Sequence, residues 1–322
     1  MRFRVTLIAL SGAIAVAACG KDNGTQPSDA VLTPDAATAG WGVHVMPARG
    51  FAPAGIELAP KARGTGIQYH GGPILVTPNV AAIYWGTSRI YNNGPTPGTK
   101  GAGSADGSMV GYFLNHFAPS PYFNINNTYT NSSGQRVANS VTYTQFWADN
   151  TNPGTKPSDA AIRAEVTKAF TSGNMTFNAS TVYLVFTGSG VNLGGGFGTQ
   201  YCAYHGHFSW NGNDVKYAAQ PYNWQFPSAC SALNGSPNND PAADAEVNTI
   251  AHESEEAATD PDLNAWYDRQ GAENADKCAW TFGTTYTTSN GSTANMNLGG
   301  KDFLIQRNWV NVGSGGCRQA YP

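Results

Sequence analysis

The segment from Asp240 to Pro261 carries both a start signal and a stop signal for a helix. Asp240 can accept hydrogen bonds from the first backbone N–H groups, and Pro241 fits the first helical turn. Pro261 disfavours helical geometry at the residue before it, so the helix is expected to end near Thr259. Apolar residues recur between these limits at helical spacing and form one stripe: Ala243, Val247, Ile250, Ala251 and Ala258. One side of this helix is therefore predicted to pack along a core.

The same helix contains the motif HExxE. His252 and Glu256 are four residues apart, so their side chains lie one turn apart on one face and can hold a single ion. Glu253 projects to the side of that face, where it can act as a general base toward water. The pattern is that of the zinc-peptidase helix, HExxH, with glutamate in place of the second histidine. It predicts a zinc site with Glu253 as the catalytic base.

A zinc ion held by this helix needs at least one further protein ligand. Asp262 follows His252 by ten residues, which is the spacing of extended zinc motifs, and is the first candidate. Glu273, Asp276 and His205 are the others. Calcium would accept the many carboxylates that follow the helix but disfavours histidine, so zinc is the expected ion and a structural calcium site is the less favoured alternative. The alternative to a metal site is a solvated acidic helix face whose histidine hydrogen-bonds a neighbour.

Signals for strands and for helices are mixed along the rest of the chain. Three β-branched or apolar runs are typical of strands, over residues 74–85, 137–147 and 181–186. A helix that carries Phe113 is expected to begin at Ser104 or Asp106. Ser158 is expected to cap another helix, over residues 159–170. We therefore predict an α+β fold, a single globular domain with a mixed sheet, several helices and long loops rich in Gly and Asn.

The N-terminus has the features of an export signal. Arg2 and Arg4 precede an apolar run that is too short for a comfortable membrane span. The run ends in Val-Ala-Ala-Cys, which resembles the lipobox of a bacterial lipoprotein. That resemblance implies cleavage before Cys19 and acylation of its thiol. Ordinary secretory cleavage after Ala18, which leaves Cys19 unmodified, is the alternative.

The chain is predicted to have three parts: a signal peptide over residues 1–18, a lipidated N-terminus and flexible tether over 19–65, and one domain over 66–322. The tether is inferred because residues 20–65 are rich in Asp, Thr, Pro, Gly and Ala and show no sustained apolar period. The expected location is the cell envelope outside the cytoplasm, with the protein either anchored to a membrane through Cys19 or secreted.

Four cysteines follow the leader: Cys202, Cys230, Cys278 and Cys317. An even set in an exported protein predicts two disulfides, for which three pairings are possible. We favour the pairing of sequence neighbours, Cys202 with Cys230 and Cys278 with Cys317. A metal site built from Cys202, His205 and His207 is the alternative, although exported thiols usually oxidise.

Charge and aromatic content exclude several classes of protein. Only 12% of residues are charged, and the formal net charge is −3 without a basic surplus, so no nucleic-acid partner is expected. Aromatic residues make up 11% of the chain, too many for a disordered acidic protein. Aromatic side chains of this kind form cores, or line grooves for sugars or peptides. The scarce acidic residues gather between Asp240 and Asp276, around His252.

Several short motifs resemble the EXORDIUM/phosphate-induced protein family. They are YHGGP at 69–73, YWG at 84–86, SPYFNI at 120–125 and CAYHG at 202–206. The similarity extends from about Tyr69 to Cys317. It implies export and a shared fold, since the plant members are secreted or wall-associated proteins linked to growth and to phosphate or hormone responses. It implies no particular reaction. The chain resembles a bacterial branch of the family that carries an HExxE helix.

Two functions remain open from the sequence. The first is a zinc-dependent hydrolase of peptidase type that acts outside the cytoplasm. The second is a non-catalytic surface or envelope protein that binds glycan or peptide, with an acidic helix that is structural or stabilised by an ion. The expected partners are a membrane, through the lipid on Cys19, and a peptide or cell-wall glycan.

Overall fold

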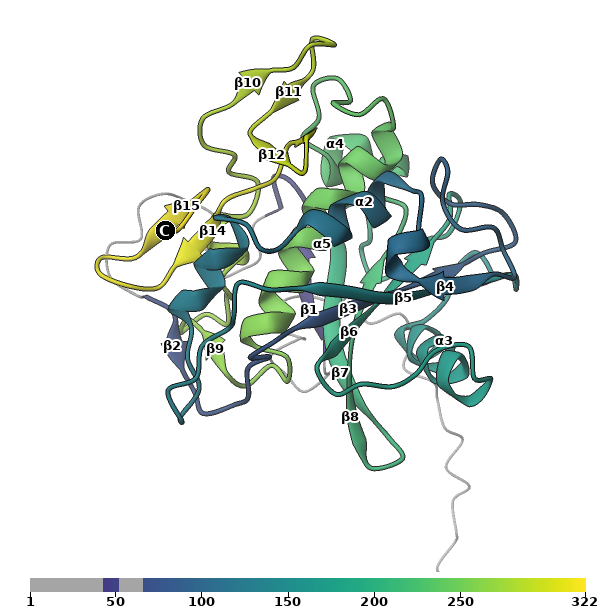
Figure 1. Cartoon of the computed structure of the whole chain (residues 1–322), viewed down its shortest axis with the longest axis horizontal. Coiled ribbons are helices and arrows are strands. Elements are labelled where there is room, and N and C mark those ends of the chain that lie inside the picture. The colour runs from purple at the N-terminus through teal and green to yellow at the C-terminus, as the bar shows by residue number, and fades with distance from the viewer. Residues whose placement is uncertain (1–42, 52–65) are drawn as a thin grey trace, which may run out of the picture. The chain divides into compact units, whose positions relative to one another are not determined.

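A seven-stranded mixed sheet organises the part of the chain that the computed structural model describes, residues 43–51 and 66–322 (Figure 1). Its strands, in spatial order, are β1 (Val43–Pro47), β7 (Tyr201–Trp210), β8 (Asn213–Gln220), β6 (Thr181–Thr187), β3 (Asn79–Trp85), β5 (Thr142–Asp149) and β4 (Lys100–Ala102). The four strands β8, β6, β3 and β5 are parallel. β4 at one edge, and β7 with β1 at the other, run antiparallel to their neighbours.

Helices cover both faces of this sheet. They are α2 (Met109–His116), α3 (Asp159–Thr171), α4 (Pro227–Cys230) and α5 (Pro241–Thr259), with short 3-10 turns η2 (Gly103–Ala105), η3 (Phe123–Thr128), η4 (Asn223–Gln225) and η5 (Asp276–Cys278). Four two-stranded sheets complete the described residues: β2 (Gln68–Tyr69) with β9 (Trp266–Tyr267), β10 (Tyr286–Thr287) with β11 (Thr293–Ala294), β12 (Met296–Leu298) with β13 (Lys301–Phe303), and β14 (Asn308–Val310) with β15 (Gly316–Arg318). This arrangement confirms the α+β prediction.

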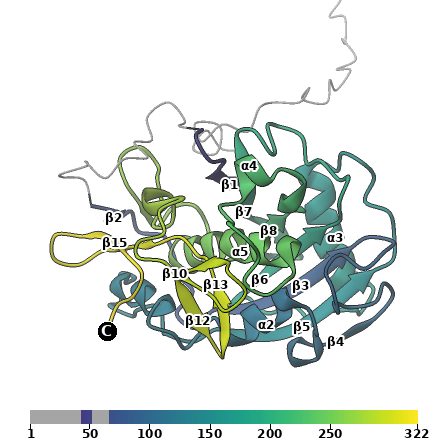
Figure 2. The same ribbon diagram turned by 90° about the horizontal axis from the view of Figure 1, so that it is seen from above.

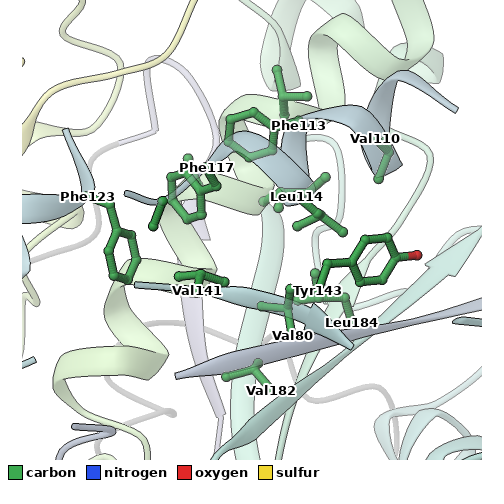
Figure 3. Packing of buried hydrophobic residues seen from close by; sticks show 14 of the residues in the cluster. Val80, Val110, Phe113, Leu114, Phe117, Phe123, Val141, Tyr143, Val182 and Leu184 are labelled. Atoms are coloured by element: carbon green, nitrogen blue, oxygen red, sulfur yellow. The ribbon is translucent and has the colours of Figure 1, made fainter. Parts of the chain in front are cut away.

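Two apolar cores lie on the two faces of the sheet. Along β3, Val80 and Ala82 face the core beneath α2 and α5, whereas Ala81 and Ile83 face the core beneath α3. Because both faces are covered, the central strands are apolar at nearly every position. Figure 3 shows the first core, in which side chains from α2, including Phe113, lie over β3, β5 and β6.

The helix α5 is buried along its length. Every residue from Ala242 to Thr259 is buried, although the sequence predicted a single apolar stripe. Strands β7 and β8 contact it, as do α2, η3 and η4. The C-terminal two-stranded sheets lie on the side of α5 away from α3 (Figures 1 and 2). The alternative of a solvated acidic helix face is therefore wrong, because the acidic side chains lie inside the protein.

Several local predictions are confirmed and others need correction. Helix α5 begins after its cap Asp240 and ends at Thr259 as predicted, and Ser158 caps α3. The cap of α2 is Ser108, whose hydroxyl accepts the N–H of Gly111, rather than Ser104 or Asp106. The expected strands over 74–85 and 137–147 are shorter or shifted, since β3 begins only after a proline and β5 begins at Thr142.

The largest correction concerns the tether predicted over residues 19–65. Val43–Pro47 is a strand of the main sheet, paired antiparallel with β7, and is buried at every position. Alternating apolar side chains at Val43 and Val45 enter the core beneath α3, which explains why this short segment is ordered against the sheet. The predicted signal peptide, Cys19 and the remainder of the tether lie outside the described residues.

Both predicted disulfides are present, Cys202–Cys230 and Cys278–Cys317. The first ties β7 to α4, and the second ties η5 to β15. Because Cys202 is disulfide-bonded, the alternative metal site with His205 and His207 is excluded. Within residues 43–51 and 66–322, no helix combines the length and the apolar character needed to span a membrane.

Replacement of Phe113 by alanine is expected to lower the free energy of unfolding by about 3–5 kcal/mol, because it opens a cavity in a close-packed core. Phe113 is fully buried, and its ring centroid lies 4.8 Å from that of Phe117 and 5.4 Å from that of Phe303. Urea denaturation would measure the loss. Val312→Ala, at a side chain that is 41% exposed, is the matched control and should change stability by less than about 0.5 kcal/mol. Equal effects of the two substitutions would contradict this packing.

Candidate metal centre

The HExxE motif lies in the C-terminal half of α5, and the two ends of the helix are defined by aspartates. The Asp240 side chain accepts the N–H of Ala243, and Pro241 occupies the first turn. At the other end, the Asp260 carboxylate accepts the N–H groups of Asn264 and Ala265, each at 2.6 Å. Asp260 therefore shapes the turn that follows the helix.

His252 and Glu256 meet on one face of α5, as the motif predicts. Their Nε2 and Oε1 atoms are 3.1 Å apart. Asp276, from η5, joins them: its Oδ1 lies 3.5 Å from the Nε2 of His252, and its backbone N–H donates to the Oε1 of Glu256 at 3.0 Å. Three of the predicted ligands thus come together although Asp276 is 20 residues beyond Glu256.

Gln306 contacts the ring of His252 at Nδ1, the nitrogen that does not face Glu256. The Gln306 Nε2 lies 3.0 Å from the Nδ1 of His252 and also donates to the carbonyl of Ala275. The Nε2 of His252 is left facing Glu256 and Asp276, whose charges raise the pKa of the ring although burial opposes it. A metal at Nε2 needs the remaining proton on Nδ1, and the Gln306 amide would then present its oxygen to the ring.

His44 enters the same cluster from β1. Its Nε2 lies 2.6 Å from the Oδ2 of Asp276 and 3.9 Å from the Oε2 of Glu256. Its Nδ1 lies 3.4 Å from the Oε1 of Glu273. His44 is not among the residues predicted from the sequence, because its segment was assigned to the tether. The alternation Val43-His44-Val45 is a short strand pattern and was the one available signal.

His205 and Glu253 form a second part of the cluster. The Nδ1 of His205 is 2.9 Å from the Oε2 of Glu253 and 3.7 Å from the Oε2 of Glu256. The other oxygen of Glu253 accepts the backbone N–H of Met46 at 3.2 Å. His44 and His205 face each other across the pairing of β1 with β7. The predicted general base thus lies between a histidine and the main chain of β1.

Asp262 does not join this cluster, and its selection as the first candidate for a further ligand is corrected. Its Oδ1 lies 3.1 Å from the Nζ of Lys216, and it groups with His207 and Asp214 instead. The ten-residue spacing fails because α5 ends at Thr259 and Asp260 has already left helical geometry, with φ −143° and ψ 60°. The chain turns at this point and carries Asp262 toward β8. Glu273, by contrast, joins the cluster. Its Oε1 lies 3.4 Å from the Nδ1 of His44 and 3.8 Å from the Nε2 of His205.

The cluster presents buried donor atoms of the kinds that bind a cation. Its candidate ligands are at most 5% exposed, yet several of their polar atoms have no hydrogen-bond partner: the Nε2 atoms of His205 and His252, the Oε2 atoms of Glu256 and Glu273, and the Oδ1 of Asp276. A buried polar atom without a partner costs about 1–3 kcal/mol. Neighbouring ligands of a tetrahedral zinc ion are about 3.4 Å apart, given bonds of about 2.1 Å. The 3.1 and 3.5 Å separations around His252 match that spacing.

The electrostatics show which groups hold protons in the metal-free protein. Although burial opposes it, the charges of Asp276 and Glu256 raise the pKa of His44 to about 9. Burial raises the pKa of Glu253 to about 8 and lowers the pKa of His205 to about 4. Burial opposes ionisation of Asp276, but His44 and His252 hold its pKa well below the usual range. A divalent cation would compete with these protons for the same atoms.

Residues 115–305 match the family model described as the phosphate-induced protein 1 conserved region. This chain belongs to the phosphate-induced protein 1 family. Two relatives in Arabidopsis thaliana are the Protein EXORDIUM-like 3, 27% identical over 280 residues, and the Protein EXORDIUM-like 5, 27% identical over 290 residues. The alignments cover 76% of this chain in both cases, with 81% of the first relative and 75% of the second. No solved structure matches the chain.

The match to the phosphate-induced protein 1 family contains most of the centre. The matched range includes six of the clustered side chains: His205, His252, Glu253, Glu256, Glu273 and Asp276. Strand β1, with His44, precedes this range. The range matched to the family model therefore includes every clustered side chain except His44, which precedes it.

The metal-free protein is expected to lose stability as the pH rises from 6.5 to about 9. The pKa of His44 is 6.5 in an unfolded chain and about 9 in the fold, and that of Glu253 changes from 4.5 to about 8. In both cases the folded state binds the proton more tightly, so this stabilisation is present at low pH and is lost as the pH rises. His205, whose pKa falls to about 4, acts in the opposite sense only below pH 6.5.

Urea denaturation in the presence of a chelator, at pH values from 6.5 to 9, would measure this loss. His44→Gln should make the decline shallower, because one of the groups that titrate in this range is removed. A free energy of unfolding that stays constant or rises across this range would contradict the proton assignment.

Proposed function

We propose that this chain is an exported zinc-dependent hydrolase of peptidase type. The observation that carries the proposal is a buried convergence on His252, whose Nε2 lies 3.1 Å from the Oε1 of Glu256 and 3.5 Å from the Oδ1 of Asp276. The unpartnered Nε2 and carboxylate oxygens of these residues are the donor atoms that zinc prefers. They come from two segments that the fold brings together, and both segments lie in the shared region of the family.

Zinc is favoured over calcium by the chemistry of the donors. Calcium takes six to eight oxygen ligands and does not use histidine, whereas this centre presents His44, His205 and His252 among its carboxylates. Four-coordinate zinc accepts nitrogen and oxygen together. Glu256 as an anionic ligand makes the centre less positive than one with three histidines, which weakens its effect on a bound water. A nearby general base then contributes more to the activation of that water.

Glu253 is the residue proposed to move protons. Zinc bound at His252, Glu256 and Asp276 would supply a Lewis acid that polarises the substrate carbonyl. Glu253 would accept the proton of the attacking water and pass it to the leaving nitrogen. His205, with Nδ1 at 2.9 Å, orients the carboxylate.

Export and anchoring belong to the same proposal. The leader with its lipobox-like end supports a mature chain that lies outside the cytoplasm and is attached to a membrane through Cys19. The two disulfides are compatible with that oxidising environment. In this location the substrates would be peptides or cross-linked peptides of the envelope.

The purified full chain is expected to bind about one zinc ion, and Glu256→Ala should abolish binding because it removes a shared ligand. Elemental analysis after dialysis at neutral pH would measure the zinc content. Glu246→Gln is the matched control. Glu246 is on the same helix and is equally buried, but it bonds Asn223 and Thr249, so zinc should be retained. Absence of zinc from the unmodified chain would refute the metal site.

Glu253→Gln separates catalysis from binding in the same experiment. Zinc content should stay unchanged, while hydrolysis of a mixture of fluorogenic peptides should fall about 10²–10⁴-fold, the usual effect of removing a general base. Zinc bound without any hydrolysis by the unmodified chain would favour the alternative function, an envelope protein that binds glycan or peptide and is stabilised by an ion.

Anchoring is tested in a bacterial host fed with labelled fatty acid. The chain should incorporate label and sediment with membranes, and Cys19→Ser should abolish both, because the acylated thiol is lost. Ser11→Ala, within the apolar run of the leader, is the control and should leave labelling unchanged. Label retained by the Cys19→Ser chain would show that the thiol is not the acylation site.

A further inference from the structure

The buried centre contains more donor atoms than the single ion of the proposed function uses. Its candidate ligand atoms form two groups of three, each within 4.8 Å of one another: His44, Glu256 and Asp276, and His205, Glu253 and Glu256. The proposed zinc position at His252 adjoins the first group, because it shares Glu256 and Asp276 with it. The second group is not accounted for by that ion.

Glu256 belongs to both groups and presents a different oxygen to His252 and to His205. Its Oε1 lies 3.1 Å from the Nε2 of His252, at the proposed zinc position. Its Oε2 lies 3.7 Å from the Nδ1 of His205 and is buried without a hydrogen-bond partner. A carboxylate that bridges two cations divides its oxygens in this way, and the ions of two-metal sites are about 3.5–4 Å apart.

The second group offers nitrogen and oxygen donors at separations that suit zinc. The Nδ1 of His205 lies 2.9 Å from the Oε2 of Glu253 and 3.7 Å from the Oε2 of Glu256, on either side of the roughly 3.4 Å between ligands of a tetrahedral zinc ion. A cation at Nδ1 replaces the proton there and leaves the ring proton on Nε2. That nitrogen faces the Oε1 of Glu273 at 3.8 Å, and a carboxylate on this side commonly supports a metal-bound histidine.

The negative charge of the centre also exceeds what one ion offsets. Four of its carboxylates are at most 2% exposed: Glu253, Glu256, Glu273 and Asp276. Among the described residues, the ion pairs of lysine and arginine all involve other carboxylates. When all four are ionised, one divalent cation offsets two of their charges, and the charge that remains is costly in a buried site. A second divalent cation would offset it.

We propose that the centre has a second, weaker cation site, in which zinc binds His205, Glu253 and Glu256, and that Glu256 is shared between the two ions. This inference rests on the proposed function. The second ion binds more weakly because the first ion repels it, so dialysis against zinc-free buffer removes the second ion and leaves the first.

The second ion inhibits hydrolysis, because it occupies the proposed base. The Oε1 of Glu253 already accepts the backbone N–H of Met46 at 3.2 Å. A cation on Oε2 takes the other oxygen and lowers the basicity of the whole carboxylate, so Glu253 no longer accepts the proton of the attacking water. The centre is therefore active with one ion and inhibited with two.

Equilibrium dialysis of the purified full chain at neutral pH, over a range of free zinc concentrations, measures both sites. The unmodified chain should bind a second zinc ion as free zinc rises, and its hydrolysis of the fluorogenic peptides should fall over the same range. His205→Gln should keep the first ion, bind the second about 100-fold more weakly or worse, and require correspondingly more zinc for inhibition. Because His205 also orients Glu253, each chain is compared with its own activity at low zinc.

His207→Gln is the matched control on the same strand. The Nδ1 of His207 lies 2.9 Å from Asp214, and these two residues form a separate group of possible ligands with Asp262. The second ion and the inhibition should be unchanged in this chain. If His207→Gln weakens the second ion and His205→Gln does not, the ion lies in that separate group and the inference is overturned.

Glu253→Gln tests the same site from α5. It should keep the first ion and lose the second, and it decides the question if His205→Gln loses both ions. Cobalt gives a spectroscopic readout, because two Co²⁺ ions that share a carboxylate couple magnetically. The electron paramagnetic resonance signal should weaken as the second Co²⁺ binds, and two independent signals would show that Glu256 is not shared.

Failure of the second site is distinguishable from failure of the proposed function. A chain that holds no zinc after dialysis refutes the proposed function and the second site with it. A chain that hydrolyses peptides with one ion, and binds no second ion or is not inhibited by it, keeps the proposed function and overturns the inference. Two bound ions without hydrolysis at any zinc concentration would refute the hydrolase and with it the inhibitory role.

Discussion

The structure depends on the burial of an acidic helix. The C-terminal half of α5 places Glu253, Glu255 and Glu256 inside the protein with no exposed surface. Buried carboxylates are costly unless they are neutralised or hydrogen-bonded. Their partners are therefore drawn from distant segments, such as His44 from β1, His205 from β7 and Asn126 from η3. The loops and edge strands around α5 can be understood as the elements that supply these partners.

The histidines are arranged by the sheet rather than by the helix. Antiparallel pairing of β1 with β7 places His44 opposite His205, and both rings face the carboxylates of α5 and of the segment that leads to η5. The disulfide between Cys278 and Cys317 ties η5, which carries Asp276, to the C-terminal strand β15. A rigid sheet edge and a cross-linked turn thus meet over a buried helix. Sites built on such elements hold their ligands more accurately than sites on free loops.

Local sequence signals were sufficient to predict α5 and the position of His252 and Glu256 on one of its faces. Asp240, Pro241 and Pro261 bound the helix because caps and prolines act within one turn, and the separation of His252 from Glu256 puts both on one face. The ten-residue spacing from His252 wrongly selected Asp262 as a ligand, because that spacing assumes that the chain continues in the same direction after the helix. The chain turns there and delivers Asp262 to Lys216.

The sequence by itself determined the helix, the HExxE pair and the α+β class, since each of these follows from residue type and short-range spacing. It favoured the observed disulfides among three possible pairings. Only the tertiary structure decided that His44, His205, Glu273 and Asp276 surround that pair, and that the acidic face is buried. The physical reason is that these contacts join residues up to 232 positions apart. Long-range strand pairing and a shared need to neutralise buried charge bring them together, and neither is visible in any local pattern.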